Sequence, residues 1–295
     1  MKSIDLSIII ISYNTKALTI RCLESIYKSF TDSHVSFEIV VVDNNSTDGS
    51  GAAISKNFPK VRLIKNQENA GFGKANNQGI KAAHGEILLL LNSDTEVIGR
   101  GIEQLYRFLI TQQAKTIVGG KLFNLDKTPQ DSCGPAYTLP MIFVALFLKG
   151  DYLHLTRYSP DTVKKVDWVM GACMMMAKRA FDDFGFFDEG IFMYMEEIDL
   201  QHRAKLKGYQ VIFFPDAYFY HKGAASSEGR AAPIINVFRG LLYFYKKHYS
   251  KWQLFILRVL LYCKALLGIV LFGLLGKKYD RNPYKEALTL VTRNI

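Results

Sequence analysis

A buried strand that ends in acidic and amide side chains constrains this chain more than any other feature. Residues 87–91 are an unbroken apolar run, and residues 92–96 read Asn-Ser-Asp-Thr-Glu. Such a run is typical of a strand covered on both faces. In open α/β sheets, ligands bind at the carboxyl ends of the strands, and carboxylate oxygens there suit a divalent cation. Capping of a following helix by Asn-Ser-Asp is the competing interpretation.

Strand-like and helix-like segments alternate along residues 4 to about 123. We expect strands at 4–12, 37–42, 61–65, 86–91 and 116–122. Between them we expect helices at about 15–30, 48–57, 74–84 and 99–112. Ser46 or Thr47 is the expected N-cap of the second helix. Alternation with short links predicts a mostly parallel, doubly wound sheet flanked by helices.

Residues 124–163 lack clear periodicity, and a flap that faces an acceptor is the one role we assign to them. Pro and Gly mark loops there, and the apolar run 141–148 is too short to span a bilayer. Further strands are expected at 166–169, 173–177 and 211–214, with a short extended piece at 217–220 before His221.

A second acidic cluster, Glu196, Glu197 and Asp199, begins a predicted helix that ends near residue 207. Acids in the first turn interact favourably with the helix dipole, which is the structural explanation. The preceding residues 191–195 are strongly apolar, so the acids are expected beside a buried wall. Burial raises a carboxyl pKa and makes a better proton acceptor. We therefore favour a catalytic role for this cluster.

Composition restricts the partners and the compartment. The net charge is +10, without a zinc-finger, RNP or basic-helix signature, and much of the excess lies in the last third beside apolar residues. An anionic membrane is thus a better partner than nucleic acid. The four scattered cysteines argue against a zinc site or disulfide framework. Residues 3–11 lack a cleavage site and predict a first strand instead of a signal peptide, which favours the cytoplasm.

Residues 233–295 are expected to form a helical C-terminal region that associates with a membrane. The uncharged run 265–276 is shorter than the about 20 residues that a spanning helix needs. Lys247, Lys251 and Arg258 fall on one stripe of a continuous helix. A basic stripe beside apolar faces is typical of a helix in the membrane interface. A helix packed on the sheet domain, a dimer contact, and a tilted or re-entrant insertion are the alternatives.

Taken in order, these motifs resemble those of the inverting nucleotide-sugar glycosyltransferases of family 2, and within them the bacterial rhamnosyltransferase branch. The matching segments are 7–14, 41–48, 69–79, 91–94, 185–189, 195–200 with Arg203, and 221–223. The resemblance implies the GT-A fold, a Rossmann-like α/β architecture, over residues 1–232. It further implies a nucleotide-sugar half at about 1–123 and an acceptor half at about 124–232.

The resemblance also implies roles for single residues. Asp43 would accept the N3–H of a uracil or thymine ring, because a carboxylate is an acceptor only. Further nucleotide-sugar contacts are expected from Ser12, Tyr13, Asn14, Gly71, Lys74, Asn77, Asn92, Ser93 and Asp94. The expected sugar or acceptor pocket contains Trp168, Gly171 and Ala172. Asp94, which ends the DxD-like segment, and His221 are the expected ligands of Mg²⁺ or Mn²⁺.

Glu197 holds the position of the family's catalytic base, usually an aspartate, with Glu196 and Asp199 as alternatives. The implied reaction is single-displacement transfer, with inversion, to a growing or polyprenyl-diphosphate-linked glycan. Its implied place is the cytoplasmic face of the bacterial inner membrane. Rhamnose from dTDP-rhamnose is the first expected donor, and UDP-galactofuranose or a UDP-hexose the second. A non-catalytic scaffold of the same fold would have lost these acids, and acids at strand ends argue against a nucleic-acid-binding protein.

Overall fold

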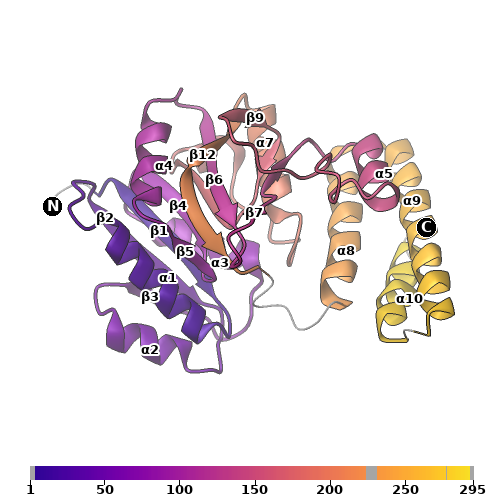
Figure 1. The fold of residues 1–295 in the computed structure, drawn as a ribbon, viewed down its shortest axis with the longest axis horizontal. Coiled ribbons are helices and arrows are strands. Elements are labelled where there is room, and N and C mark those ends of the chain that lie inside the picture. Colours follow the sequence, from indigo (N-terminus) through magenta and orange to yellow (C-terminus); the bar gives the residue numbers. More distant parts are fainter. Residues whose placement is uncertain (1–3, 224–230, 277, 293–295) are drawn as a thin grey trace.

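The computed structural model describes residues 4–223, 231–276 and 278–292. A mixed sheet with the strand order β3-β2-β1-β4-β11-β6-β12-β5 forms the centre of the molecule. Helices cover both faces of this sheet, and α8, α9 and α10 stand together at one side (Figure 1).

The N-terminal half of the sheet is parallel, as predicted. Its strands are β1 (Leu6–Ser12), β2 (Phe37–Asp43), β3 (Arg62–Lys65) and β4 (Ile87–Asn92). The connecting helices are α1 (Lys16–Ser29), α2 (Ser50–Asn57) and α3 (Phe72–Ala82). Because the strands are parallel, β1, β2 and β4 end at the same edge of the sheet.

The other half of the sheet mixes directions. β11 (Cys173–Ala177) lies antiparallel between β4 and β6 (Thr116–Phe123). β12 (Gln210–His221) runs parallel to β6 and pairs antiparallel with β5 (Thr95–Val97). The helices here are α4 (Gly101–Ile110), α6 (Ala180–Phe184) and α7 (Glu196–Leu206). The shorter strands are β7 (Pro129–Gln130), β8 (Cys133–Gly134), β9 (Lys164–Val166) and β10 (Trp168–Val169).

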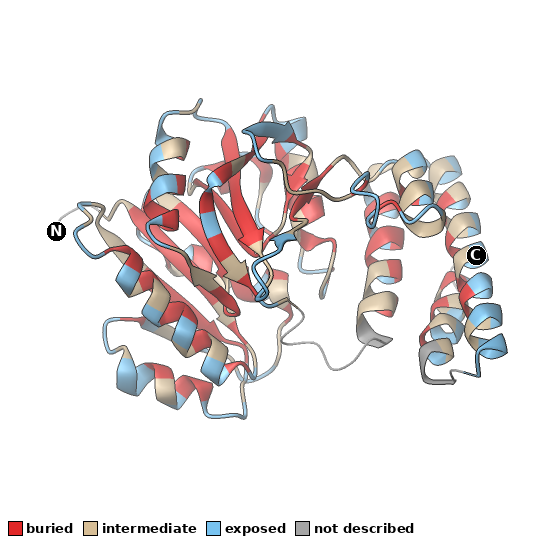
Figure 2. Ribbon diagram, viewed as in Figure 1, coloured by how far each residue is buried: buried red, intermediate tan, exposed pale blue. Residues whose placement is uncertain are grey.

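Strand β4 has a hydrophobic cluster on each face, which explains its unbroken apolar run. Leu89 and Leu91 pack with residues of α1, α2 and α4, whereas Leu88 and Leu90 pack with residues of α3, α6 and α7. Figure 2 shows the same arrangement, with buried strands inside and the outer faces of the helices exposed. The α/β prediction is confirmed.

Several boundaries differ from the prediction for identifiable reasons. β5 was not predicted, because three residues are too few to show a pattern. β12 continues through Pro215, where its register against β6 shifts at a bulge; proline is tolerated at such positions. α2 is preceded by Gly49 in the left-handed conformation, with φ of 81°, so neither Ser46 nor Thr47 is its N-cap. The run 141–148 lies largely within a helix, α5 (Leu139–Phe147).

The C-terminal helices are α8 (Ala231–His248), α9 (Lys251–Leu274) and α10 (Lys278–Thr292). Their hydrophobic core is shared with the sheet domain, because Trp168, Met195 and Ile198 belong to the same cluster as α8, α9 and α10 residues. Gly240 of α8 lies directly against the turn before α7, and a Cβ there would come within 2.8 Å of the Tyr194 carbonyl oxygen. The division at residue 232 stays a prediction.

A fully buried carboxylate, Asp199, joins α7 to α8. It accepts hydrogen bonds from Arg203 Nε (2.8 Å), Lys247 Nζ (2.8 Å) and His248 Nε2 (2.6 Å). Burial alone would raise the pKa of Asp199, but hydrogen bonds from Lys247 and His248 and the Arg203 charge lower it. The predicted stripe of Lys247, Lys251 and Arg258 is wrong, because the helix breaks between α8 and α9 and Lys247 faces the sheet domain.

Helix α9 exposes an extended apolar face. Trp252, Phe255, Val259, Tyr262, Leu267, Val270, Leu271 and Leu274 are between 40% and 83% exposed. Within the described residues, α9 is the one helix long and apolar enough to cross a membrane. The sequence analysis considered only the uncharged run 265–276 and therefore underestimated the length of the apolar helix, which extends over 24 residues. Lys264 on it donates to the Leu146 carbonyl of α5 at 2.6 Å.

Replacing Asp199 with alanine should reduce the free energy of unfolding by about 3–5 kcal/mol, because Arg203, Lys247 and His248 would lose the buried carboxylate to which all three donate. Urea unfolding of the full chain in detergent measures this loss. Glu24→Ala, at an exposed acid of α1, is the control and should change stability by less than about 0.5 kcal/mol. A loss below about 1 kcal/mol for Asp199→Ala would show that α8 is held mainly by apolar packing.

Candidate active site

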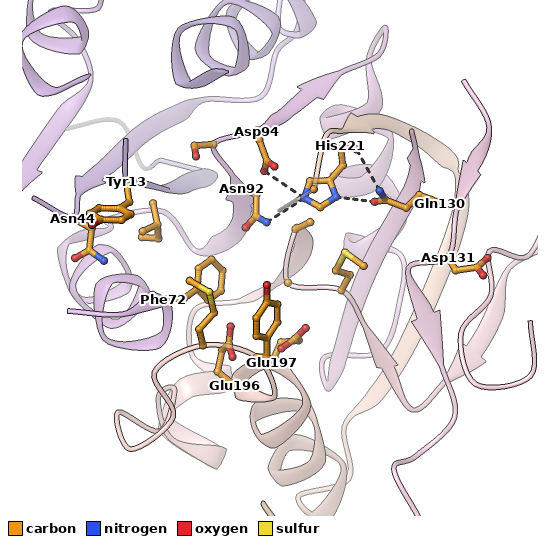
Figure 3. Close-up of a pocket in the computed structure, with 18 of the residues that line it drawn as sticks. Tyr13, Asn44, Phe72, Asn92, Asp94, Gln130, Asp131, Glu196, Glu197 and His221 are labelled. Atoms are coloured by element: carbon orange, nitrogen blue, oxygen red, sulfur yellow. Dashed lines mark hydrogen bonds and ion pairs between the residues drawn. The ribbon is translucent and has the colours of Figure 1, made fainter. Parts of the chain in front are cut away.

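A cavity of about 530 Å³ lies at the edge of the sheet where β1, β2 and β4 end. Tyr13 and Asn44 line one end, and Gln130 and Asp131 line the other (Figure 3). Between them lie Asp94 and His221 on one side and Glu196 and Glu197 on the other. The volume suits a small-molecule ligand, and the carboxylates match the edge expected for an α/β sheet.

Strand pairing brings Asp94 and His221 together across the chain. His221 ends β12 and stands opposite Thr95 of β5, and the Lys222 N–H donates to the Asp94 carbonyl at 3.1 Å. His221 Nε2 lies 3.4 Å from Asp94 Oδ1 and 3.3 Å from Asn92 Nδ2. Burial would raise the pKa of Asp94, but the neighbouring His221 and nearby backbone N–H groups lower it. The predicted pair is thus adjacent in space, with Asp94 ionised at neutral pH.

These residues fit a divalent cation. Two ligands at right angles on a Mg²⁺ ion, each at 2.0–2.1 Å, stand roughly 3 Å apart, close to the separation of the Asp94 and His221 atoms. Asn92 Oδ1 is buried without a hydrogen-bond partner in the described residues, because the amide nitrogen faces His221. Buried polar atoms normally have a partner, so Asn92 Oδ1 is available to a ligand or its bound water.

The acids of α7 are presented by a strained turn. Tyr194 and Met195 both have positive φ, 65° and 77°, which is unusual for residues other than glycine. Such conformations cluster at functional sites, where the surrounding structure enforces them. Here Gly240 of α8 accommodates the turn, and Glu196 and Glu197 emerge from it as the first residues of α7.

Glu196 is buried and the adjacent Glu197 is half-buried, and the Oε2 atom of each is buried with no hydrogen-bond partner among the described residues. Burial raises the pKa of Glu196 well above its usual value, and the neighbouring charge of Glu197 raises it further. Burial also raises the pKa of Glu197, while the Arg157 charge opposes that shift. Glu196 therefore takes up a proton first, and Glu197 is the better placed to act as a base.

Arg157 lines the same cavity and was missed by sequence reasoning. Its guanidinium lies 5.2 Å from the centre of the Trp168 ring, a cation–π arrangement. Trp168 itself does not line the cavity; its indole nitrogen donates to the Pro135 carbonyl at 2.9 Å. The predicted pocket role of Trp168 is thus indirect, through Arg157. Gly171 and Ala172 do line the cavity, and Gly171 lies beside Glu197.

At the opposite end, Asn44 connects the loops that follow β2 and β3. It is buried, donates to Asn69 Oδ1 at 2.7 Å and accepts from Asn66 and Ala70. Asp43, one residue earlier, is buried at the end of β2 and accepts from the Ser46 N–H at 3.0 Å. Asn44 was part of a recognised motif, which is the signal that could have identified it.

Several predicted binding residues lie outside the described cavity lining. Ser12 contacts Thr19 within the protein, Asn14 accepts from the Thr47 N–H, and Lys74 is exposed. The Asn77 amide is engaged by the Phe187 backbone, and Gly71 packs against Phe192 with φ of 81°. Asp43 is outside this lining too, whereas Tyr13, Asn92, Ser93 and Asp94 line the cavity.

Asp199 is also outside the cavity lining. Its two oxygens accept hydrogen bonds from Arg203 of α7 and from Lys247 and His248 of α8. The prediction of Asp199 as an alternative catalytic base is therefore wrong. Asp199 positions α7 instead.

Comparison with known proteins identifies relatives of this chain. It is 26% identical over 242 residues to an N-acetylglucosaminyl-diphospho-decaprenol L-rhamnosyltransferase of Mycobacterium tuberculosis, covering 72% of this chain and 76% of the relative. It is 30% identical over 207 residues to a low-salt glycan biosynthesis hexosyltransferase of Haloferax volcanii, covering 68% of this chain and 62% of the relative.

The fold is similar to that of solved glycosyltransferases. A mannosyltransferase of Pyrobaculum calidifontis, in complex with GDP-mannose and Mn²⁺, matches with a TM-score of 0.57 and 18% identity over 97% of this chain and 84% of its own. GalNAc-T7 with UDP, GalNAc and Mn²⁺ matches with a TM-score of 0.60 and 17% identity, over 83% and 50%. The predicted GT-A fold is confirmed. The model of glycosyl transferase family 2 matches residues 7–184, and the chain therefore belongs to this family.

Proposed function

We propose that this chain is a metal-dependent inverting glycosyltransferase that moves a hexose from a nucleotide-diphospho-sugar to a lipid-linked or growing glycan. The observation that carries the proposal is that Asp94 and His221 face Glu196 and Glu197 across one cavity. A non-catalytic scaffold would not require unpartnered carboxylate oxygens to be kept buried, because their desolvation is costly.

The donor would lie with its base near Tyr13 and Asn44 and its diphosphate near Asp94. Asp43, beside Asn44, would accept the N3–H of the base, and Gly51 lies against its carboxylate, where a Cβ would come within 2.5 Å of Oδ2. Asp94 and His221 would hold Mg²⁺ or Mn²⁺, with Asn92 Oδ1 beside them. A bound divalent ion stabilises the charge that develops on a leaving diphosphate.

Glu197 would deprotonate the acceptor hydroxyl as this oxygen attacks the anomeric carbon from the face opposite the nucleotide. The new glycosidic bond forms as the bond to the diphosphate oxygen breaks, and this single displacement inverts the configuration. Glu196, whose pKa burial and the Glu197 charge both raise, would be protonated beside it and would add no second negative charge to the site. Arg157 would oppose the effect of burial on Glu197 and offers a positive charge to an anionic acceptor.

The acceptor side favours a membrane-bound substrate. The loop that leads to Arg157 exposes Leu148, Tyr152, Leu153 and Leu155, and α9 exposes a longer apolar face. The loop directly follows α5, and α5 packs against α9, so the two surfaces lie in the same region of the molecule. A chain lying on the cytoplasmic face of the bacterial inner membrane would bury them and bring the cavity to a polyprenyl-diphosphate-linked acceptor.

For the donor, rhamnose from dTDP-rhamnose is our first candidate, supported by the mycobacterial relative's name. UDP-galactofuranose or a UDP-hexose is the second, because the haloarchaeal relative is named a hexosyltransferase.

Donor binding should require both the metal and Asp94. Titration calorimetry of the full chain with dTDP-rhamnose and UDP-sugars, with and without Mn²⁺, should reveal one donor class that binds only with the metal. Asp94→Ala should abolish that binding, because one of the two protein ligands is lost. Asp182→Ala, at an exposed acid of α6, should bind normally. A folded wild-type chain that binds none of these donors would overturn the catalytic proposal and favour the scaffold.

Replacing Glu197 with glutamine should lower kcat by about 10²–10⁴-fold, the usual contribution of a general base, and leave donor binding unchanged. Glu196→Gln should remain within about tenfold of wild type, because glutamine imitates its protonated form. Since burial raises the pKa of Glu197, kcat should fall on acidification at a pH above the ordinary glutamate value of about 4.3. Loss of activity in Glu196→Gln alone would assign the base to Glu196.

Vesicles containing anionic lipid should bind the full chain through α9. Charges at two exposed positions, Leu267→Glu with Leu271→Glu, should weaken binding by at least about tenfold, because two buried leucines would be lost from the bilayer. Ile110→Glu with Leu206→Glu, also at exposed apolar residues but on α4 and α7, is the matched control and should bind normally. Equal binding of both double variants would exclude α9 as the contact.

A further inference from the structure

The hairpin that follows β6 has a role in the site that the sequence did not indicate. Residues 124–130 turn the chain back so that β7 pairs antiparallel with β6, with Gln130 opposite Leu122. On β6, the next residue, Phe123, stands opposite Tyr220 of β12. The hairpin therefore carries Gln130 to the end of β12, where His221 lies.

Gln130 holds the imidazole of His221 from the side away from Asp94. Its Oε1 lies 2.7 Å from His221 Nδ1 (Figure 3). Its amide nitrogen donates to Asn124 Oδ1 at 2.9 Å and to the His221 carbonyl at 3.4 Å. Because the amide nitrogen is used on these two acceptors, the amide oxygen is the atom that faces the ring.

Asn124 is itself fixed, so the orientation of Gln130 is built into the hairpin. Its amide nitrogen donates to Thr128 Oγ1 at 3.0 Å, and its backbone pairs with that of Thr128 at 2.9 Å. Asp126 accepts from the Thr128 N–H at 3.0 Å and from its hydroxyl at 2.6 Å. Side-chain hydrogen bonds of this kind are typical of tight turns.

The hydrogen-bond partners determine which ring nitrogen carries the proton. An amide oxygen is an acceptor only, so His221 Nδ1 must donate to it. A neutral imidazole then presents a lone pair at Nε2, the atom nearest Asp94 Oδ1 and Asn92 Nδ2. Without Gln130, the carboxylate of Asp94 would favour the other tautomer, in which Nε2–H donates to it and no lone pair is left for an ion.

We propose that Gln130 is a positioning residue that fixes His221 in the Nδ1–H tautomer and so makes its Nε2 available as a metal ligand, with Asn124 orienting Gln130. The inference rests on the proposed metal-dependent function. It assigns a function to the hairpin after β6, which is to orient the imidazole of His221 through its Nδ1 atom. Groups that orient a ligating histidine contribute to metal affinity although they never contact the ion.

Manganese binding to the full chain tests this role directly. Free Mn²⁺ is measured by electron paramagnetic resonance, with Mn²⁺ alone and with Mn²⁺ plus UDP. Gln130→Met keeps the length of the side chain but removes the acceptor, and it should weaken Mn²⁺ binding by about 10–100-fold. Gln130→Glu keeps an acceptor oxygen and should stay within a few-fold of wild type. Gln112→Met, at a half-buried glutamine just after α4, controls for the substitution and should not change binding.

A second readout follows the tautomer without any metal. In ¹⁵N spectra of the histidine-labelled chain, the His221 signals, identified by their loss in His221→Asn, should show a protonated Nδ1 and an unprotonated Nε2. In Gln130→Met the proton should shift toward Nε2, while thermal unfolding shows that the variant is folded.

The outcomes separate this inference from the proposed function. A wild-type chain that binds Mn²⁺, with Gln130→Met binding equally well, would overturn the role of Gln130 alone. An Nε2–H tautomer in the wild type would do the same. A folded wild-type chain that binds no Mn²⁺, with or without UDP, would overturn the metal-dependent function and the inference with it.

Discussion

The hydrogen bonds that compensate the buried charge of Asp199 attach the C-terminal helix α8 to α7 of the sheet domain. An isolated carboxylate with no exposed surface would be strongly destabilising, and Asp199 is tolerated because α7 and α8 together supply Arg203, Lys247 and His248. Since Asp199 lies two residues after Glu197, the same ion cluster that attaches the C-terminal helices also fixes the start of α7. The position of the proposed base therefore depends on a helix that contributes no residue to the cavity lining described.

The mixed sheet explains how the two sides of the site meet. Its parallel half delivers Tyr13, Asn44 and Asp94 to one edge by the ordinary geometry of α/β sheets. The antiparallel pairing of β5 with β12 then places His221 beside Asp94, although 127 positions separate them in the sequence. With β11 running against its neighbours, Gly171 and Ala172, just before that strand, arrive at the same edge and face the acids of α7.

Sequence reasoning identified the residues whose positions follow from local pattern. A buried strand that ends in Asn-Ser-Asp places Asp94 at the sheet edge whatever the rest of the chain does, and an apolar run before Glu197 predicts its burial. Asp199 has the same local pattern, and only the contact with α8, 48 residues away, shows that it is structural. Gln130 and Arg157 lie in an aperiodic region, where no spacing indicates which side chain reaches the cavity. Lys247 was placed on one stripe with Lys251 and Arg258 because the segment was treated as a single continuous helix, whereas the structure breaks it at residues 249–250.

The contact between Gly240 and the left-handed turn at residues 194–195 has a consequence for how such a chain can be divided or recombined. The backbone of that turn is held in an unfavourable conformation, and a glycine 45 residues further along the chain provides the space for it. Helix α8 thus contributes to the shape of the turn that presents the two proposed catalytic glutamates. In an isolated sheet domain the turn would lose this support, and in a chimera with a larger residue at position 240 the side chain would clash with the turn. Either change would redirect both glutamates. The C-terminal helices and the geometry of the proposed active site could therefore not be exchanged independently of each other.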